Sequence, residues 1–313
     1  MLTYIIRRLL WAIPTVVVIA TIVFVLMRVI PGDPALLIIG PFATPEQVEK
    51  LRVQFGLDEP LVQQYVTWLW GLVRGDWGKS FQTRSPVLPL LAERFPKTLQ
   101  LTIFGLLISL GIGVPLGILA ATRTHTLVDY LSTATAVFGI SMPMFWLAIV
   151  LQLIFAVKLH WFPLSGSGGG LLTSANLRHL VLPGLSLGLP YAAQYLRFTR
   201  STMLEILGLD YIKVARSKGL SERVVVYGHA LRNALIPIVT LLGLRIPWMI
   251  GGAVVIETIF AWPGMGSLVV RAIYNRDFHV VEGFMVFLAL MVVLSNLIVD
   301  LLYGILNPTV RYD

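Results

Sequence analysis

Long apolar runs separated by short polar segments dominate the pattern of the chain. A helix that crosses a bilayer needs about 20 mostly apolar residues. Six runs approach or exceed this length: Leu9–Ile30, Leu99–Ala121, Tyr130–Val157, Leu180–Leu196, Leu235–Ile256 and Gly283–Leu306. Pro143 predicts a kink in the third run, and Pro183 and Pro190 interrupt the fourth, which is also the shortest. The pattern therefore predicts an all-α integral membrane protein with six transmembrane helices.

The first run is preceded by Arg7 and Arg8, a layout that is similar to a secretory signal peptide. Its apolar stretch is too long for a signal peptide, however, and no small-residue cleavage site follows it. We therefore expect an uncleaved first helix.

Lysine and arginine favour the short cytoplasmic loops of membrane proteins, so their positions predict the orientation of the helices. Arg7 and Arg8 precede the first helix, and Arg123 and His125 lie between the second and the third. The segment between the fourth and fifth helices is also rich in basic residues: Arg197, Arg200, Lys213, Arg216, Lys218, Arg223 and Arg232. All three segments fall on one side, which we expect to be the cytoplasm, and both termini then lie on that side.

This orientation divides the chain into four parts. We expect a cytoplasmic N-terminus and first helix at 1–30, an external segment at 31–97, a transmembrane region at 98–306 and a cytoplasmic tail at 307–313. A cytoplasmic loop at 201–234 lies within the transmembrane region.

The external segment carries the signals of two short helices. Thr44, Pro45 and Gln47 stand where an N-cap, a first-turn proline and a capping-box glutamine are expected, and Gly56 would end this helix. Pro60 would start the second helix, whose apolar residues recur at helical spacing: Leu61, Tyr65, Trp68, Leu69 and Leu72. The two helices could form a cap that only packs on the membrane region, or a docking surface for an external partner. Spacing alone does not decide between these functions.

The composition excludes most other classes of protein. Hydrophobic residues make up 57% of the 313-residue chain and charged residues only 13%, whereas about a quarter of a soluble globular chain is charged. The absence of cysteine removes disulfides and thiolate metal sites. The net charge of +8 comes with basic residues at membrane flanks and with no basic stripe on a soluble domain, so we expect no nucleic-acid partner.

No motif indicates a catalytic centre, a cofactor or a metal ion. Gly78-Lys79-Ser80 resembles the end of a phosphate-binding loop, but Val73 stands where such a loop requires glycine. Ser165–Gly170 is glycine-rich without the strand and helix of a dinucleotide site, which predicts a flexible external loop. The five histidines lack metal-ligand spacing, and no serine or carboxylate pair has a catalytic context. We therefore expect no enzymatic activity in this chain.

The segment Glu205–Arg232 is too polar to span a bilayer and too apolar to be a simple tether. Its apolar positions form one helical stripe, which consists of Leu204, Leu207, Ile212 and Ala215. Gly219 would break this helix, and Ser221 could cap a second one with Glu222 in its first turn. We expect two short helices at the membrane surface. They could bind anionic lipid as an amphipathic pair, or form a lever that a cytoplasmic motor holds.

The run Asp210–Leu220 (DYIKVARSKGL) in this segment, followed by His229–Pro237 (HALRNALIP) across its end, resembles the cytoplasmic loop of ABC-transporter permeases of the dipeptide/oligopeptide/nickel family. The general permease loop begins with Glu-Ala-Ala, whereas Lys213-Val214-Ala215 stands here, and the loop is longer before its closing proline. Further motifs extend the resemblance over nearly the whole chain: Pro31-Gly32-Asp33-Pro34, Phe55-Gly56-Leu57-Asp58, Gly75-Asp76-Trp77-Gly78, Glu257-Thr258-Ile259-Phe260, Trp262-Pro263-Gly264 and Asn296-Leu297-Ile298-Val299-Asp300. The near-terminal run Asn307–Tyr312 is similar to the glutathione-transporting branch, although so short a run does not fix a substrate.

The resemblance implies a type I ABC importer permease fold in the cell inner membrane. It also implies a complex with a second, homologous permease, two cytoplasmic ATPase subunits and an external solute-binding protein, with ATP hydrolysis on the ATPase subunits. Membrane lipid surrounds the helices, and the solute would be a peptide, glutathione or a nickel complex. The resemblance places the ATPase contact on one set of loop residues: Asp210, Lys213, Ala215, Arg216, Lys218, Gly219, Leu220 and Ser221.

Arg245 is the ionisable residue that we expect nearest the middle of a membrane helix. Counting from Leu235 at about 1.5 Å per residue places it roughly 15 Å into a core about 30 Å thick. A stand-alone channel or secondary carrier usually has ionisable residues inside the membrane for ion coupling. Here only Arg245 is expected at such depth, because Asp300 and Glu257 lie nearer helix ends. Arg245 could be held by backbone carbonyls or by a carboxylate of the second permease. Alternatively, it could line the translocation path and bind a substrate carboxylate.

Overall fold

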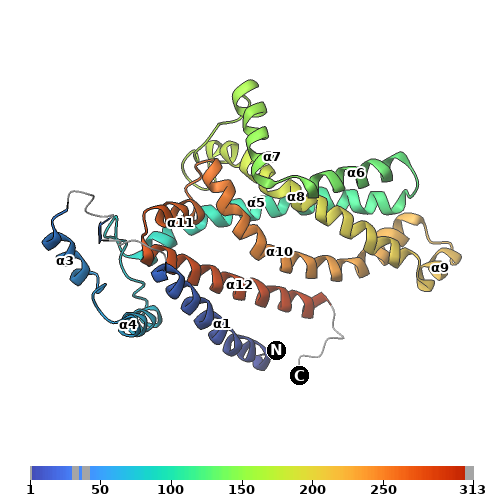
Figure 1. The fold of residues 1–313 in the computed structure, drawn as a ribbon. Coiled ribbons are helices and arrows are strands. Elements are labelled where there is room, and N and C mark those ends of the chain that lie inside the picture. Colours follow the sequence, from blue (N-terminus) through green and yellow to red (C-terminus); the bar gives the residue numbers. More distant parts are fainter. Residues whose placement is uncertain (1, 30–34, 37–42, 307–313) are drawn as a thin grey trace. The chain divides into compact units, whose positions relative to one another are not determined.

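The computed structural model describes residues 2–29, 35–36 and 43–306, and helices dominate this part of the chain (Figure 1). The predicted all-α class is therefore confirmed. The Pro31–Pro34 motif and the expected tail at 307–313 lie outside the described residues. Contacts group the described part into two compact units.

The first unit comprises residues 1–96 and 264–294. Its helical elements are α1 (Leu2–Val29), α3 (Pro45–Gln54), α4 (Leu61–Arg74), the beginning of α5 (Val87–Thr122), α11 (Met265–Tyr274) and most of α12 (Phe278–Leu306). The predicted capping box of α3 is confirmed: the Gln47 amide donates to the Thr44 hydroxyl at 3.3 Å, and the Thr44 amide donates to the Gln47 side chain at 3.0 Å. Gly56, at φ +64°, lies just after the end of α3.

A buried carboxylate organises the loop after α4. Asp277 lies directly before α12 and accepts a hydrogen bond from the Ser80 hydroxyl at 2.5 Å. The His279 ring contacts the Lys79 carbonyl at 2.9 Å. A side chain at Gly78 would meet the same ring, because a Cβ there would lie 2.9 Å from it. The run Gly78-Lys79-Ser80 is therefore a structural turn packed on α12.

The second unit comprises residues 97–263 and 295–313. Its elements are most of α5, α6 (Leu127–Ser141), α7 (Met144–Leu151), the π-helical segment η1 (Gln152–Lys158), α8 (Ser174–Leu207), α9 (Asp210–Ser217), the π-helical segment η2 (Val224–Ala230), α10 (Leu231–Ile259) and the end of α12. The long helix α8 packs against α6, α7 and α10 and is the central element of this unit (Figure 1).

Pro143 breaks the third predicted span. α6 ends at Ser141, α7 begins at Met144, and the two helices meet at 102°. Proline lacks an amide hydrogen and forces the preceding residue out of the helical region, and Met142 is accordingly extended at ψ 127°. The kink expected at this proline is confirmed, and it is sharp enough to divide the span into two helices.

The predicted count of six transmembrane helices is not confirmed. By length and composition, four of the described helical stretches could cross a membrane, at residues 10–29, 87–122, 224–259 and 278–299; counting the bent pair α6 and α7 gives five. The remaining predicted run, Leu180–Leu196, lies inside α8, which is long enough but less apolar. Polar residues such as Ser186 and Thr199 are buried along α8, because protein rather than lipid surrounds it.

Glycine brings α5 and α8 close together. A Cβ at Gly113 would lie 2.8 Å from the Tyr195 Cβ, and one at Gly117 would lie 2.6 Å from the Thr199 Cβ. Small residues allow membrane helices to approach until their backbones nearly touch. The glycines of α5 therefore fix the distance between these two helices.

Candidate functional site

The segment between α8 and α10 forms a compact loop, called the α9 loop here and defined as residues 208–223. α8 ends at Leu207, α9 follows, and Gly219 turns the chain at φ +78°. The helix resumes at Glu222, directly after Ser221, and continues through η2 into α10. The prediction of two separate short helices is thus wrong for the second one, because it is the beginning of α10. The π-helical segment η2 joins the helical residues Glu222 and Arg223 to α10, and π-helical turns are frequent at functional sites.

An apolar core fixes α9 to the helices on either side. Ile212 and Ala215 are 0% and 7% exposed, and Leu204 and Leu207 pack against the same core, so the predicted stripe is confirmed. The rest of the core comes from α5, α8, η2 and α10: Ile118, Ala121, Met203, Val225, Val226, Ala230, Ala234 and Ile238. A force on α9 would therefore act on the ends of three long helices together.

The outer surface of the α9 loop carries nearly all the residues predicted to contact an ATPase. Seven of these residues are exposed: Asp210, Lys213, Arg216, Lys218, Gly219, Leu220 and Ser221. Ala215 is the exception, because it belongs to the apolar core beneath the loop. It supports the surface and is not part of it.

Two short-range ion pairs shape this surface. The Lys213 ammonium lies 2.8 Å from the Asp210 carboxylate, and the Arg216 guanidinium lies 2.7 Å from the Glu222 carboxylate. The hydrogen bond from Arg216 lowers the pKa of Glu222 below its ordinary value. Beside the charges, the side chain of Leu220 is 39% exposed. The surface therefore presents an apolar contact among charges of both signs.

Some polar atoms on α8 and α10 lack hydrogen-bond partners among the described residues. Arg245 is half-buried, and its Nε has no hydrogen-bond partner among the described residues. The same is true of the Tyr195 hydroxyl and the Thr199 hydroxyl on α8, although both residues are fully buried. Arg245 lies within electrostatic range of the hydroxyls of Tyr191 and Tyr195. This polar seam, defined as Tyr191, Tyr195 and Arg245, is costly unless a ligand or water satisfies it.

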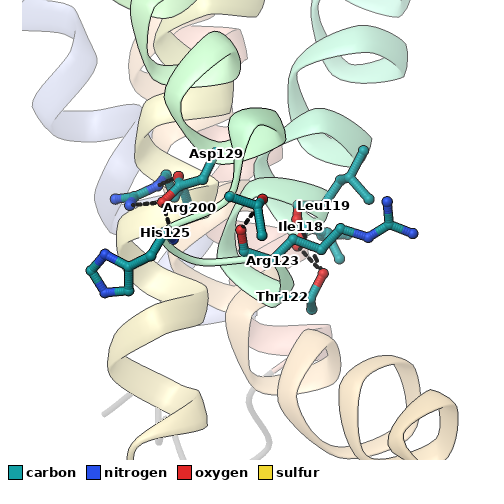
Figure 2. A network of polar contacts seen from close by, with 8 residues as sticks. Ile118, Leu119, Thr122, Arg123, His125, Asp129 and Arg200 are labelled. Atoms are coloured by element: carbon teal, nitrogen blue, oxygen red, sulfur yellow. Dashed lines mark hydrogen bonds and ion pairs between the residues drawn. The ribbon is translucent and has the colours of Figure 1, made fainter.

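A bidentate ion pair links the first turn of α6 to α8 (Figure 2). Arg200 Nε donates to Asp129 Oδ1 at 2.6 Å, and the guanidinium also reaches Oδ2 at 2.9 Å. The His125 amide donates to the same carboxylate at 3.2 Å. Our reading of the sequence did not single out Asp129. A lone carboxylate in the first turn of an apolar helix is the signal that could have identified it.

The glycine-rich loop at 165–170 is more firmly held than predicted. The Gly166 amide donates to the Phe260 carbonyl at 2.9 Å, and Lys97 Nζ donates to the Gly169 carbonyl at 2.6 Å. Asn176 also donates to the Ser167 carbonyl. These contacts fasten the loop to α5, α8 and the end of α10.

The part of the chain that the structure describes contains no group of three or more His, Cys, Asp or Glu side chains able to hold a metal ion. The rings of His179 and His279 each contact a backbone carbonyl, at 2.8 Å and 2.9 Å. These contacts give both histidines a structural role.

Comparison with known sequences covers the whole chain. Residues 113–312 match the model of the family described as binding-protein-dependent transport system inner membrane component, and residues 1–102 match the model of the N-terminal part of such membrane components. The chain is 45% identical to a peptide transport system permease protein of Brucella abortus (strain 2308) over 314 residues, which cover 100% of both chains. It is 42% identical to the glutathione transport system permease protein GsiC of Escherichia coli (strain K12) over 312 residues, again 100% of both.

Solved structures support the fold. A chain of the MetNI methionine ABC transporter in an inward-facing conformation matches with a TM-score of 0.57 and 20% identity, covering 70% of this chain and 97% of that one. At this identity the match shows the fold alone, which is that of a type I ABC importer permease. The family resemblance inferred from the loop motifs is confirmed. The chain belongs to the family of binding-protein-dependent transport system inner membrane components.

Proposed function

We propose that this chain is a transmembrane permease subunit of an ATP-driven, binding-protein-dependent importer of peptides, dipeptide-, oligopeptide- or glutathione-like. The observation that carries the proposal is the full-length similarity to permeases named for peptide and glutathione transport. Similarity over the whole chain covers the helices that would form the path as well as the loop that would contact an ATPase. The alternatives are import of another small solute, such as a nickel complex, and a stand-alone channel or secondary carrier.

The importer would contain a second, homologous permease, two cytoplasmic ATPase subunits and an external solute-binding protein. The chain would lie in the inner membrane with the α9 loop, the α5–α6 turn and both termini in the cytoplasm. The basic residues of these segments support this orientation. The four parts of the chain expected from the sequence, with boundaries at 30, 97 and 306, follow from the same orientation.

ATP hydrolysis would take place on the ATPase subunits and reach this chain through the α9 loop. Because one apolar core joins α9 to α5, α8 and α10, closure of the ATPases would move these helix ends together. The ion pair of Asp129 and Arg200 would extend the same movement to α6. Rocking of packed helices as a body is a common form of alternating access.

The polar seam would lie on the path. Arg245 has no carboxylate partner among the described residues, so its guanidinium is available to a substrate carboxylate, and the tyrosine hydroxyls beside it can donate to peptide carbonyls. The other possibility is a structural bond to the second permease. Contact with the substrate would make the rate of transport depend on the charge of the solute, whereas a structural bond to the second permease would not.

Loss of the apolar contact on the α9 loop tests the proposed ATPase contact. Leu220→Glu changes an exposed side chain without altering the backbone. Fully burying a leucine stabilises by about 1.5–3 kcal/mol, so covering the 39% of Leu220 that is exposed contributes only about 1 kcal/mol. The glutamate adds the cost of a carboxylate in an apolar contact, so we expect affinity for the ATPase subunits to fall about tenfold. Leu127→Glu is the matched control, because Leu127 is an exposed leucine at the first residue of α6, outside the α9 loop. Copurification of the ATPases with each variant measures the difference.

Two substitutions at Gly219 distinguish the effect of the backbone conformation from the effect of the exposed surface. Its φ of +78° strains most side chains, whereas asparagine tolerates this region. Gly219→Asn should therefore retain the ATPases, and Gly219→Leu should lose coupled uptake while still inserting in the membrane. Equal copurification of Leu220→Glu and Leu127→Glu, together with normal uptake by Gly219→Leu, would show that the loop is only an amphipathic pair on lipid.

A further inference from the structure

The helix α4 presents three different faces along its length. One face packs inward and includes Trp68, which is 8% exposed. A second face is polar and consists of Gln63, Thr67 and Arg74. The third face, called the apolar stripe here, consists of Val62, Val66, Leu69 and Val73, which recur at intervals of three and four residues. Its valines are well exposed, at 76%, 58% and 77%. Apolar surface of this kind is unfavourable in water, so we expect another apolar surface to cover it.

The inward face of α4 packs on the last turns of α1. Thr21 Oγ1 lies 2.7 Å from the Tyr65 hydroxyl, and the ring of Phe24 lies 5.1 Å from that of Tyr65 and 5.5 Å from that of Trp68. Arg28 Nε donates to the Gln64 side chain at 3.2 Å. At about 1.5 Å per residue, the contact region reaches roughly 12 Å back from the end of α1.

This contact region belongs to the part of α1 that is apolar enough to span a membrane, residues 10–29. The contact therefore places α4 beside one leaflet of the bilayer rather than above it. Figure 1 shows α1 running across the view and α4 nearly end-on, so the two axes cross. If α1 crosses the bilayer, α4 lies along its surface.

An apolar groove continues the stripe onto α1. It encloses about 320 Å³ and its lining includes Val25 and Val29 of α1 and Leu61 and Val62 of α4. The outer surface of α1 beside it is equally apolar, since Val25 and Val29 are 51% and 71% exposed. The lipid-facing surface of α1 thus passes into the stripe of α4 without interruption.

Trp70 marks the boundary between the apolar stripe and the polar face. It is 57% exposed, and the Arg74 guanidinium lies 4.7 Å from the centre of its ring. Tryptophan prefers the headgroup level of a bilayer, and arginine extends its charged end toward water from the same level. The order of residues around α4 therefore runs from hydrocarbon through headgroups to water.

We propose that α4 is an interfacial helix seated in the outer leaflet, with the acyl chain of a phospholipid in the groove between α1 and α4. The crossing of the two helices, the depth of their contact and the continuity of their apolar surfaces carry this assignment. Amphipathic helices of this kind bury their apolar face about 5–10 Å into the boundary between headgroups and acyl chains. The helix would anchor the external part of the first unit to the membrane, a function separate from the proposed transport of solute.

Spin labels test the position of each face. The chain has no cysteine, so Val66→Cys and Val73→Cys place labels on the apolar stripe, and Gln63→Cys and Thr67→Cys serve as matched controls on the polar face of the same helix. The complete transporter, with cysteine-free partner subunits, is reconstituted in phospholipid bilayers. Oxygen concentrates in hydrocarbon, whereas a charged-ligand nickel complex stays in water. We expect oxygen to exceed the nickel complex in accessibility at 66 and 73, and the reverse at 63 and 67.

The groove is tested with a fluorescent label on Val62→Cys in the same bilayers. Phospholipids brominated along the acyl chain should quench this label more strongly than a label on Gln63→Cys. Access of the nickel complex to positions 66 and 73 would show that the stripe faces water and overturn the proposal. Exclusion of both oxygen and the nickel complex would show that a protein, either the second permease or the external binding protein, covers the stripe. Equal quenching at 62 and 63 would exclude the acyl chain from the groove.

Discussion

The packing of α5 on α8 gives a prediction whose size follows from the structure. In Gly117→Ala, the new Cβ would lie 2.6 Å from the Thr199 Cβ and 2.8 Å from the Leu196 carbonyl oxygen. Carbon atoms in contact are normally about 3.5–4.0 Å apart, so the helices would have to separate by roughly 1 Å. Overpacking of this kind costs about 1–3 kcal/mol, and the backbone carbonyl cannot move aside as a flexible side chain could.

The same helix provides the control. A Cβ at Gly111 has nothing within 4 Å, so Gly111→Ala tests the gain in helix propensity without the clash. Alanine is worth about 0.5–1 kcal/mol more than glycine inside a helix. We expect Gly111→Ala to raise the midpoint of thermal aggregation of the purified complex in detergent, and Gly117→Ala to lower it. Equal midpoints for the two variants would refute the close approach of α5 and α8.

Charged and exposed residues give three further tests. Asp129→Asn should leave Arg200 without its carboxylate partner and lower the stability of the complex by about 2 kcal/mol. The loss is smaller than the ~3–5 kcal/mol expected for a fully buried pair, because Arg200 reaches solvent. An unchanged thermal midpoint would contradict this prediction. Arg245→Gln should lower uptake of anionic peptides about tenfold relative to neutral ones, since a charged hydrogen bond contributes about 1.5–3 kcal/mol. Unchanged relative rates would exclude substrate contact, and failure to assemble would favour the structural role. Cysteine at Thr83 should react with an impermeant thiol reagent from outside, and cysteine at Ser217 only after permeabilisation; the reverse pattern would invert the topology.

Local signals in the sequence predicted local structure well. The capping box at Thr44, the break at Pro143 and the inward-facing stripe through Ile212 and Ala215 each depend on residues a few positions apart. Such features need no knowledge of the rest of the fold. The family resemblance is confirmed as well. It could be predicted because many short motifs along the chain combine into one specific pattern.

Features that depend on distant residues were missed. Hydropathy measures lipid exposure, so it predicted only residues 180–196 of α8 (Ser174–Leu207), where neighbouring helices allow polar residues such as Ser186 and Thr199 to be buried. The ion pair of Asp129 and Arg200 joins positions 71 residues apart, which no local pattern reveals. The polar character of Ser80 in the predicted external segment would favour it as a site for topology labelling, yet its hydroxyl is buried against Asp277. Thr83, which is exposed, takes its place.

Uptake by the complete transporter tests the central claim most directly. The complex containing this chain is reconstituted in liposomes with ATP enclosed, which energises only the complexes whose ATPase subunits face the lumen. Radiolabelled peptide is added outside with the external binding protein. The account predicts uptake that requires both ATP and the binding protein, and that is lost with Leu220→Glu but retained with Leu127→Glu. Uptake that continues without ATP or without the binding protein, or that follows an imposed ion gradient, would contradict it and indicate a channel or secondary carrier.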